Sequence, residues 1–414
     1  MKKSGFQYVF VMIAMCGLVG AAVGICSGSA GLFYSFISKE LGLSSGSVSL
    51  MYTIQAMIGA VAGLFVPRIL KKPGMLKPLI FAGTALMAGG TFLLSLAGNI
   101  FTLYAFSIIR GIGSGMMSFV LATTVINNWF YARNGLMVSI AMAFSGIPNV
   151  LLSNVFTSYI SAHGWRSGYV FVTFVLLAFC LPAVLLPVSL RPQQKGLEAY
   201  GYEDYVKYRE ANPDKVVVQA GTDHIPLISP QMAALMLFTV NVCIIAGFLQ
   251  QMPSFAVSIG MTAAIGASMA SAASLSNILS KLMYGVLTDK IGPHKSSLLC
   301  AGINIVSIFI LMFIRTPITV VLGAFMYGFS FANSATAMSV LTRETFGIEN
   351  YTRVYPLISF AGSSANALGV TLLGMVFDST GSYTAVFLLL LILQLLVVLY
   401  TIGLMKLRNT KTAA

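Results

Sequence analysis

The stretch Gly285-Val-Leu-Thr-Asp289-Lys290-Ile-Gly292-Pro-His-Lys295 follows a long apolar segment and leads the chain into the next one. A shorter counterpart, Gly63-Leu-Phe-Val-Pro67-Arg68, closes an apolar segment nearer the N-terminus. Around these two turns, segments of about 20 apolar residues, the length that crosses a bilayer, alternate with short charged loops. The composition agrees, because 57% of the 414 residues are hydrophobic and only 8% are charged, against about 25% charged in soluble domains. The sequence therefore predicts an all-α integral membrane protein and excludes a soluble enzyme core.

Twelve membrane spans are predicted, six before residue 190 and six after residue 229. They are 8–36, 47–67, 77–97, 101–126, 134–160, 168–189, 230–256, 262–288, 297–314, 318–341, 353–377 and 382–405. The turn motifs repeat at equivalent positions, which predicts two pseudo-symmetric six-helix halves, 1–189 and 230–414, joined by a polar linker over 190–229. Transporters build a binding site at the membrane midplane between repeats of this kind.

The basic residues indicate the orientation of these spans. With the N-terminus inside, nineteen of the 24 Lys and Arg fall on cytoplasmic segments and three fall outside, namely Lys39, Arg166 and Arg315. This asymmetry predicts cytoplasmic termini in a plasma membrane of the bacterial inner-membrane type. The net charge of +13 is scattered over loops, so it does not indicate nucleic-acid binding. The five cysteines all lie within spans and predict neither a disulfide framework nor a metal site.

Lys281 and Asn277 form the main candidate binding pair. Lys281 precedes Asp289 by eight residues, which places it roughly 12 Å along a helix from the cytoplasmic interface at about 1.5 Å per residue. A lysine within the membrane costs about 2.5 to 3.5 kcal/mol and usually faces a water-filled cavity or a partner. Asn277 lies one turn earlier on the same face. The pair favours binding of a carboxylate; the alternative is a lysine that snorkels to the headgroups.

None of the 11 acidic residues and none of the three histidines falls deep in a predicted span. The usual intramembrane proton carriers are therefore missing. Either Lys281 titrates and couples transport to protons, or one anion is exchanged for another. Moving a single anion against the membrane potential costs about 2.3 kcal/mol per 100 mV, and exchange avoids this cost, so the sequence favours exchange over proton symport.

Several motifs resemble the Major Facilitator Superfamily. The stretch 285–295 is similar to the family's loop signature between the second and third helices of a half, and Arg110-Gly-Ile-Gly113-Ser-Gly115 is similar to its fourth-helix motif. Gly31-Leu-Phe-Tyr34-Ser-Phe, the stretch 128–135 and Gly164-Trp165-Arg166-x-x-Tyr169 resemble the branch of monocarboxylate transporters and oxalate/formate antiporters. The resemblance implies a twelve-helix fold and a gating role for Gly285, Asp289, Lys290, Gly292 and Lys295.

Two departures from the family pattern qualify what the resemblance implies. Pro67 stands where the first-half loop signature places an acidic residue, so the charge-pair latch is expected only in the second half. Oxalate-exchanging members are expected to present an Arg on the eighth helix and a Lys on the eleventh. Here the eighth helix offers Lys281, and the eleventh has no basic residue between Val354 and Phe377.

Further candidate residues lie on other predicted spans. Arg110 lies near the middle of its span, where a structural role in bonding to neighbouring helices is favoured over substrate binding. Gly146 and Pro148 predict a kink and packing site that serves conformational change. Four residues are candidate hydrogen-bonding groups along the pathway: Tyr34, Gln55, Asn149 and Tyr327.

The sequence predicts no enzyme and no cofactor, because it contains no HExxH, GxSxG or Walker motif and no buried carboxylate pair. A pore would need selectivity rings or filter loops, which the short loops do not provide. The predicted function is secondary transport of a small organic anion, such as lactate, pyruvate or formate, by a monomer that alternates access across the bilayer. A proton-coupled symporter, an oxalate/formate exchanger, a nutrient sensor and a neutral-solute or drug transporter are the alternatives.

Overall fold

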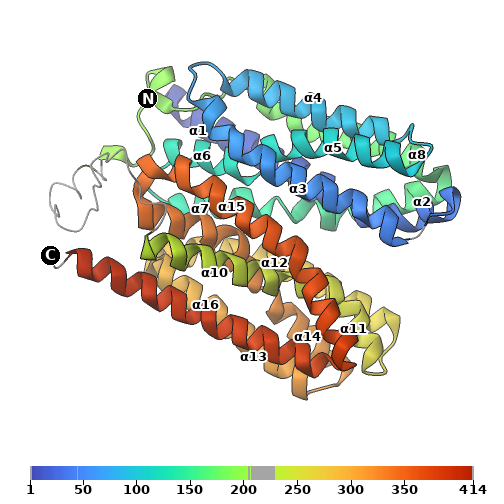
Figure 1. Cartoon of the computed structure of the whole chain (residues 1–414). Helices are drawn as coiled ribbons and strands as arrows, with labels where there is room; N and C mark the ends of the chain where they lie inside the picture. The colour runs from blue at the N-terminus through green and yellow to red at the C-terminus, as the bar shows by residue number, and fades with distance from the viewer. Residues whose placement is uncertain (1, 44, 204–205, 207–228, 413–414) are drawn as a thin grey trace. The chain divides into compact units, whose positions relative to one another are not determined.

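The computed structural model describes residues 2–43, 45–203, 206 and 229–412, and its regular elements are helices (Figure 1). The chain divides into two compact units. Unit 1 comprises residues 1–132 and 141–202, and unit 2 comprises residues 133–140 and 203–414. The predicted linker 190–229 lies largely outside the described residues, and its boundaries stay a prediction.

Unit 1 contains the helices of the first part of the chain. They are α1 (Lys2–Val19), η1 (Gly20–Ser27), η2 (Ala30–Leu32), α2 (Tyr34–Leu41), α3 (Ser45–Leu70), α4 (Leu76–Leu94), α5 (Ile100–Met116), α6 (Phe119–Trp129), α8 (Ile147–Leu185) and η3 (Pro192–Lys195). Helix α7 (Asn134–Ala143) begins among the residues grouped with unit 2 and ends in unit 1. Element η1 is a π-helix that continues α1, and such segments depart from the regular α-helical hydrogen-bond pattern.

Glycines allow close packing of α5 against both α3 and α4. A Cβ on Gly115 would lie 2.1 Å from the carbonyl oxygen of Gly59 in α3. A Cβ on Gly90 in α4 would lie 2.5 Å from the backbone nitrogen of Arg110 in α5. No side chain fits at such distances, so these glycines allow the backbones to approach as small residues do in membrane helix pairs. The contact at Gly90 fixes the backbone position of Arg110.

Unit 2 contains the helices of the second part of the chain. They are α10 (Pro230–Ala246), η4 (Gly247–Gln251), α11 (Met252–Ser258), α12 (Ala263–Ile291), α13 (Pro293–Phe313), α14 (Pro317–Tyr327), η5 (Ala332–Ala337), α15 (Met338–Thr380) and α16 (Tyr383–Thr412). Sequence signals fix several of these ends. The Ser229 hydroxyl accepts a hydrogen bond from the Met232 N–H ahead of α10, and Thr316 forms a capping box with Thr319 ahead of α14. Such caps satisfy the free N–H groups of a first helical turn.

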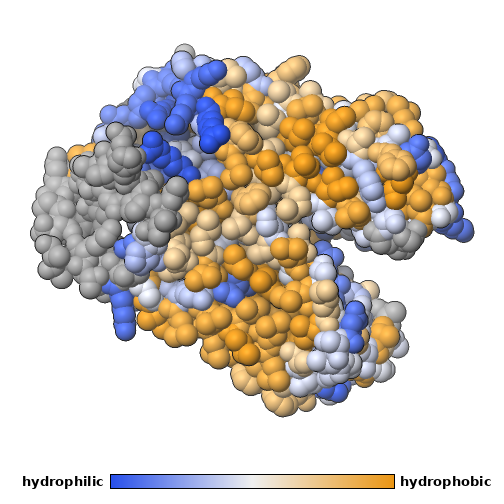
Figure 2. All heavy atoms as spheres, viewed as in Figure 1, coloured by the Kyte–Doolittle hydropathy of each residue, from blue (hydrophilic) through white to orange (hydrophobic). Residues whose placement is uncertain are grey.

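The described helices account for twelve membrane spans. Ten segments are long and apolar enough to cross a bilayer, and one of them, Asn134–Leu185, has 52 residues. This segment holds two spans, because Gly164 has a non-helical backbone with φ of 82° inside α8. The twelfth span is α12, which has 29 residues but carries too many polar side chains to be among the ten. Figure 2 shows hydrophobic residues over large parts of the visible face. Large side chains in the middle of spanning helices, such as Phe81 in α4 and Phe174 in α8, are exposed, as expected for lipid-facing surfaces.

Several predicted spans are interrupted in the structure, and two of these breaks follow α5 and α7. The span 101–126 is broken at Met117 and Ser118 between α5 and α6, and the span 134–160 is broken at residues 144–146 between α7 and α8. In the second break, Pro148 occupies the first turn of α8, where its missing N–H has no intrahelical partner to lose.

Candidate functional site

Lys281 and Asn277 lie on the polar helix α12 of unit 2. The Lys281 side chain is buried, with 2% of its surface exposed. Asn277 is half-buried, and its Oδ1 atom is buried without a hydrogen-bond partner among the described residues. A buried polar atom without a partner costs roughly 1 to 3 kcal/mol, so Asn277 can still accept a hydrogen bond.

A neighbouring stripe of α12 packs against the end of α14. The Ser280 hydroxyl donates to the carbonyl oxygen of Gly328 at 3.2 Å. A Cβ on Gly328 would lie 2.6 Å from the side chain of Ser276. Packing therefore uses the stripe of Ser276 and Ser280, whereas the adjacent stripe carries Asn277 and Lys281.

Tyr327 is engaged inside unit 2. Its hydroxyl donates to the carbonyl oxygen of Ile245 in α10 at 2.7 Å, and the side chain is fully buried. This hydrogen bond connects α14 to α10. It uses the hydroxyl hydrogen of Tyr327, which the sequence analysis considered as a donor to a ligand.

Arg110 lies at the centre of unit 1 and is fully buried. Its Nη2 atom donates to the carbonyl oxygen of Cys26 at 2.6 Å, and Cys26 is in the π-helix η1. The Gln55 Nε2 atom donates to the Cys26 sulfur at 3.5 Å. Tyr34, the first residue of α2, lies within electrostatic range of the guanidinium. The structure thus brings Arg110, Gln55 and Tyr34 together around the end of η1.

The predicted kink residues also contact the η1 segment. A Cβ on Gly24 would lie 3.1 Å from the Pro148 ring, and one on Gly28 would lie 3.0 Å from the side chain of Asn149. Gly146 caps the start of α8. The break between α7 and α8 therefore packs against η1, next to the residues that surround Arg110.

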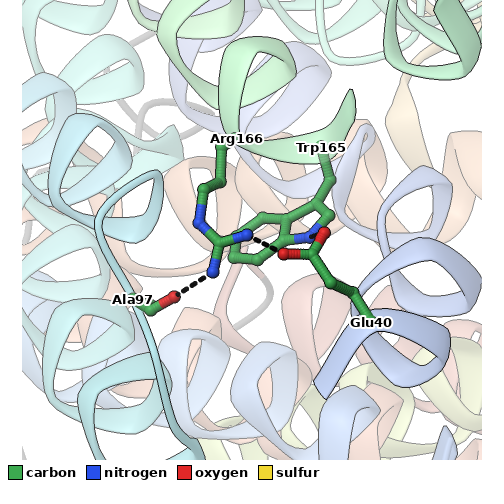
Figure 3. A network of polar contacts seen from close by, with 4 residues as sticks. All are labelled: Glu40, Ala97, Trp165 and Arg166. Atoms are coloured by element: carbon green, nitrogen blue, oxygen red, sulfur yellow. Dashed lines mark hydrogen bonds and ion pairs between the residues drawn. The ribbon is translucent and has the colours of Figure 1, made fainter. Parts of the chain in front are cut away.

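A polar network at the second half of α8 was not anticipated from the sequence (Figure 3). The Trp165 Nε1 atom donates to Glu40 at 2.6 Å, and Arg166 bonds to both Glu40 and the carbonyl oxygen of Ala97. The Arg166 guanidinium also lies 4.2 Å from the centre of the Trp165 ring. The network ties α2, α8 and the connection between α4 and α5 together, and it fixes the orientation of the Trp165 ring.

Trp165 positions Tyr169, which lies beside Arg110. The two rings meet edge to face with centroids 6.1 Å apart, and Tyr169 stacks on Phe33 at 3.9 Å. The Arg110 guanidinium lies 5.9 Å from the centre of the Tyr169 ring, within cation–π range. The four-residue spacing of Trp165 and Tyr169 was the available signal, since it places both rings on one helical face.

The stretch 285–295 contacts the start of α7 within unit 2. A Cβ on Gly285 would lie 2.5 Å from the Ser139 hydroxyl, so glycine is required for this approach. Asp289, which follows the predicted span 262–288, accepts hydrogen bonds from the N–H groups of Gly135 and Leu136.

The rest of this stretch provides the turn and two basic side chains. Gly292 joins α12 to α13 with φ of 84°, a left-handed conformation that glycine adopts without strain. Lys290 is exposed at the end of α12, and Lys295 is exposed in the first turn of α13.

The sequence profile of the Major Facilitator Superfamily matches residues 15–317 and 252–414. The chain belongs to the Major Facilitator Superfamily. Proteins of this superfamily are membrane transporters of small molecules and not enzymes, so the chain is a multi-pass membrane transporter with the twelve-helix fold in two six-helix halves.

Two curated transporters are similar to the chain at low identity. The oxalate:formate antiporter of Oxalobacter formigenes is 24% identical over 313 residues, which cover 73% of this chain and 67% of the antiporter. The sialic acid transporter NanX of Escherichia coli (strain K12) is 22% identical over 316 residues, which cover 74% of this chain and 72% of NanX.

Solved superfamily structures share the fold. The proton:xylose symporter XylE, bound to 6-bromo-6-deoxy-D-glucose, aligns with a TM-score of 0.75 at 15% identity and covers 96% of this chain and 95% of its own. FucP in the outward conformation aligns with a TM-score of 0.71 at 14% identity and covers 96% of this chain and 99% of its own. At these identities the likeness concerns the fold alone.

Proposed function

We propose that this transporter moves a small organic anion, a monocarboxylate of the lactate, pyruvate or formate type, by alternating access and in exchange for a second anion. Lys281 neutralises the carboxylate, and Asn277 orients it. The monomer is the transporting unit, and both termini face the cytoplasm of a cell whose plasma membrane holds the protein.

The burial of Lys281 carries this proposal. Its side chain is 2% exposed on a membrane-spanning helix, where the ammonium group carries a cost of about 2.5 to 3.5 kcal/mol. A carboxylate bound next to it offsets this cost, because the ligand brings the opposite charge. The unpartnered Oδ1 of Asn277 one turn away supports the same position, since it can accept a hydrogen bond from a hydroxyl such as that of lactate.

The charge balance supports exchange over proton symport. All 11 acidic residues and all three histidines lie outside the deep parts of the predicted spans. Exchange of like charges avoids the cost of about 2.3 kcal/mol per 100 mV that import of a single anion would carry. In the alternative, proton symport, Lys281 itself would be the titrating group.

Conformational change in the proposed cycle involves two regions. The first is the loop with Gly285, Asp289, Lys290, Gly292 and Lys295, which gates the cytoplasmic side. The second is the break with Gly146 and Pro148, whose contacts with η1 would shift as the helices rearrange. Asp289 supports the first role, because its hydrogen bonds to the start of α7 are contacts that a change of conformation can break.

Exchange of oxalate for formate is a second candidate function. It is favoured by the 24% identity to the antiporter of Oxalobacter formigenes and by the buried Arg110, a second fixed positive charge.

Counterflow in proteoliposomes distinguishes these functions. Vesicles preloaded with unlabelled lactate, formate or oxalate are diluted into each labelled anion at two external pH values and at two imposed membrane potentials. Monocarboxylate exchange predicts saturable uptake of labelled lactate or formate that changes little with pH or potential. Uptake that requires an inward proton gradient would instead establish symport, and uptake of no carboxylate would reject the anion assignment.

A further inference from the structure

Arg110 carries more hydrogen-bond donors than unit 1 satisfies. A guanidinium has five N–H groups, and Cys26 provides the acceptors beside it: its carbonyl oxygen at 2.6 Å from Nη2 and its sulfur, which is a weak acceptor. The Nε and Nη1 atoms are both buried and have no hydrogen-bond partner in the described part of the chain. Nη2 has two hydrogens, and the carbonyl takes one of them. One two-pronged edge of the guanidinium, meaning a pair of parallel N–H donors on neighbouring nitrogens, therefore remains complete. Such a pair binds a carboxylate with two parallel hydrogen bonds.

The charge of Arg110 is equally uncompensated within unit 1. Ion pairs among the described residues include Arg166 with Glu40 and His294 with Glu344. Neither pair involves Arg110, which is fully buried. A buried charge without a counter-charge is strongly destabilising, and the carbonyl of Cys26 and the face of the Tyr169 ring supply partial negative charge only. An anion would complete this environment.

Tyr169 adds a second unused group at the same position. Its hydroxyl is buried without a hydrogen-bond partner among the described residues, and its ring lies 5.9 Å from the guanidinium. Stacking on Phe33 and the edge contact with Trp165 fix the ring, and the network of Glu40 and Arg166 fixes Trp165 in turn (Figure 3). The unused donors of Arg110 and the unused hydroxyl of Tyr169 are therefore held in place by packing.

We propose that Arg110 and Tyr169 form a carboxylate-binding subsite contained within unit 1 and separate from Lys281. The guanidinium binds the carboxylate through its free edge, and the Tyr169 hydroxyl donates a further hydrogen bond. This inference rests on the proposed anion transport and extends it, because the transporter then has two positions that each bind one carboxylate group.

Equilibrium binding of labelled formate to the purified, full-length protein in lipid nanodiscs tests this subsite. Formate presents one carboxylate and little else, so it reports each position by itself. Because Arg110 is fully buried, formate is expected to reach it slowly, and binding is measured at equilibrium. We expect two formates per chain for the wild type, and one for Lys281→Gln and for Arg110→Gln.

The variants separate this subsite from the Lys281 position. In the Lys281→Gln background, Arg110→Gln is expected to weaken formate binding about 10- to 100-fold, since it removes hydrogen bonds from a charged donor, and Tyr169→Phe about 2- to 10-fold. Arg110→Lys retains the charge without the two-pronged edge and is expected to bind more weakly than the parent. Arg68→Gln makes the same change on an exposed arginine of unit 1 and is expected to leave binding unchanged.

Two results would overturn the subsite and leave the proposed function standing. In the first, Lys281→Gln alone removes all formate binding. In the second, Arg110→Gln and Tyr169→Phe bind formate as tightly as their parent. Tyr169→Phe retains the ring and its packing, so it keeps the test valid if Arg110→Gln folds poorly. A wild-type protein that binds no carboxylate at all would reject both the subsite and the proposed function.

Discussion

Gly90 and Gly89 are adjacent glycines of α4 with opposite surroundings. A Cβ on Gly90 would lie 2.5 Å from the Arg110 nitrogen, 2.8 Å from its Cα and 2.9 Å from its Cβ, whereas a Cβ on Gly89 would have nothing within 4 Å. Both substitutions to alanine remove the same flexibility from the same helix, and both gain about 1 kcal/mol of helix propensity. Their difference therefore reports the contact with α5 alone.

The size of this difference follows from the geometry. Ordinary van der Waals contact of a Cβ begins at 3.4 Å, so Gly90→Ala requires α4 and α5 to separate by about 0.9 Å. Overpacking of this kind typically costs about 1 to 3 kcal/mol. We expect Gly90→Ala to be less stable than Gly89→Ala by that amount, which corresponds to about 2 to 4 °C in Tm for each kcal/mol in a domain of 150 to 250 residues. Since the clash is with Arg110 itself, formate exchange should also fall in Gly90→Ala and stay near wild type in Gly89→Ala.

Thermal unfolding in detergent and counterflow in proteoliposomes measure the two effects. The scan rate is kept constant, because membrane proteins often unfold irreversibly and the apparent Tm then depends on it. Equal Tm values and equal exchange for Gly89→Ala and Gly90→Ala would refute the close packing of α4 on α5 at Arg110.

Three further predictions concern other contacts of the structure. Tyr327→Phe removes the hydrogen bond to the Ile245 carbonyl and should lower stability by about 1 kcal/mol in the same thermal scan, with little change in formate affinity because the hydroxyl is already engaged. Trp129→Phe removes the hydrogen bond from Nε1 to the Ser189 carbonyl at 2.9 Å, so amide hydrogen exchange over residues 186–202 should become faster, and unchanged protection there would contradict this contact. Asp289→Asn weakens charge-assisted bonds to the start of α7 and should change the exchange rate more than the equilibrium affinity for formate; the reverse pattern would argue against a gating role.

Most of the fold could be predicted from the sequence, because hydropathy acts locally along the chain. Each span is apolar over a length set by the bilayer, and the polar turns between spans are visible as charged residues. The helix α12 is the instructive case. It crosses the membrane with less hydropathy than its neighbours, and Lys281, Asn277 and several serines are the cause of this deficit. The same polar residues that weaken the hydropathy signal are the ones that indicate a binding position.

The contacts of the candidate residues could not be predicted in the same way, because they depend on tertiary packing. The sequence favoured a structural role for Arg110, and the structure does show one hydrogen bond to the backbone of η1. It also shows two unused nitrogens, which no pattern in the sequence indicates. The acceptor is a carbonyl near the end of the eight-residue π-helix η1, a rare type of helix that the apolar pattern of this span does not distinguish from an α-helix.

The contacts of Tyr169 also depend on tertiary packing and could not be predicted from the sequence. A spacing of four residues places Trp165 and Tyr169 on one helical face, but the sequence does not show that Phe33 stacks on the Tyr169 ring while Arg110 lies near it. These three residues come from different parts of unit 1 and meet only after the helices have packed.

Counterflow of labelled formate with wild type, Lys281→Ala and the exposed-site control Lys71→Ala tests the central claim most directly. If Lys281 neutralises the transported carboxylate, vesicles preloaded with unlabelled formate should transiently accumulate the label with wild type and with Lys71→Ala, and should not do so with Lys281→Ala. Accumulation by Lys281→Ala equal to that of wild type would show that Lys281 is a structural residue. It would contradict the assignment of this transporter to small organic anions, because that assignment depends on the Lys281 side chain.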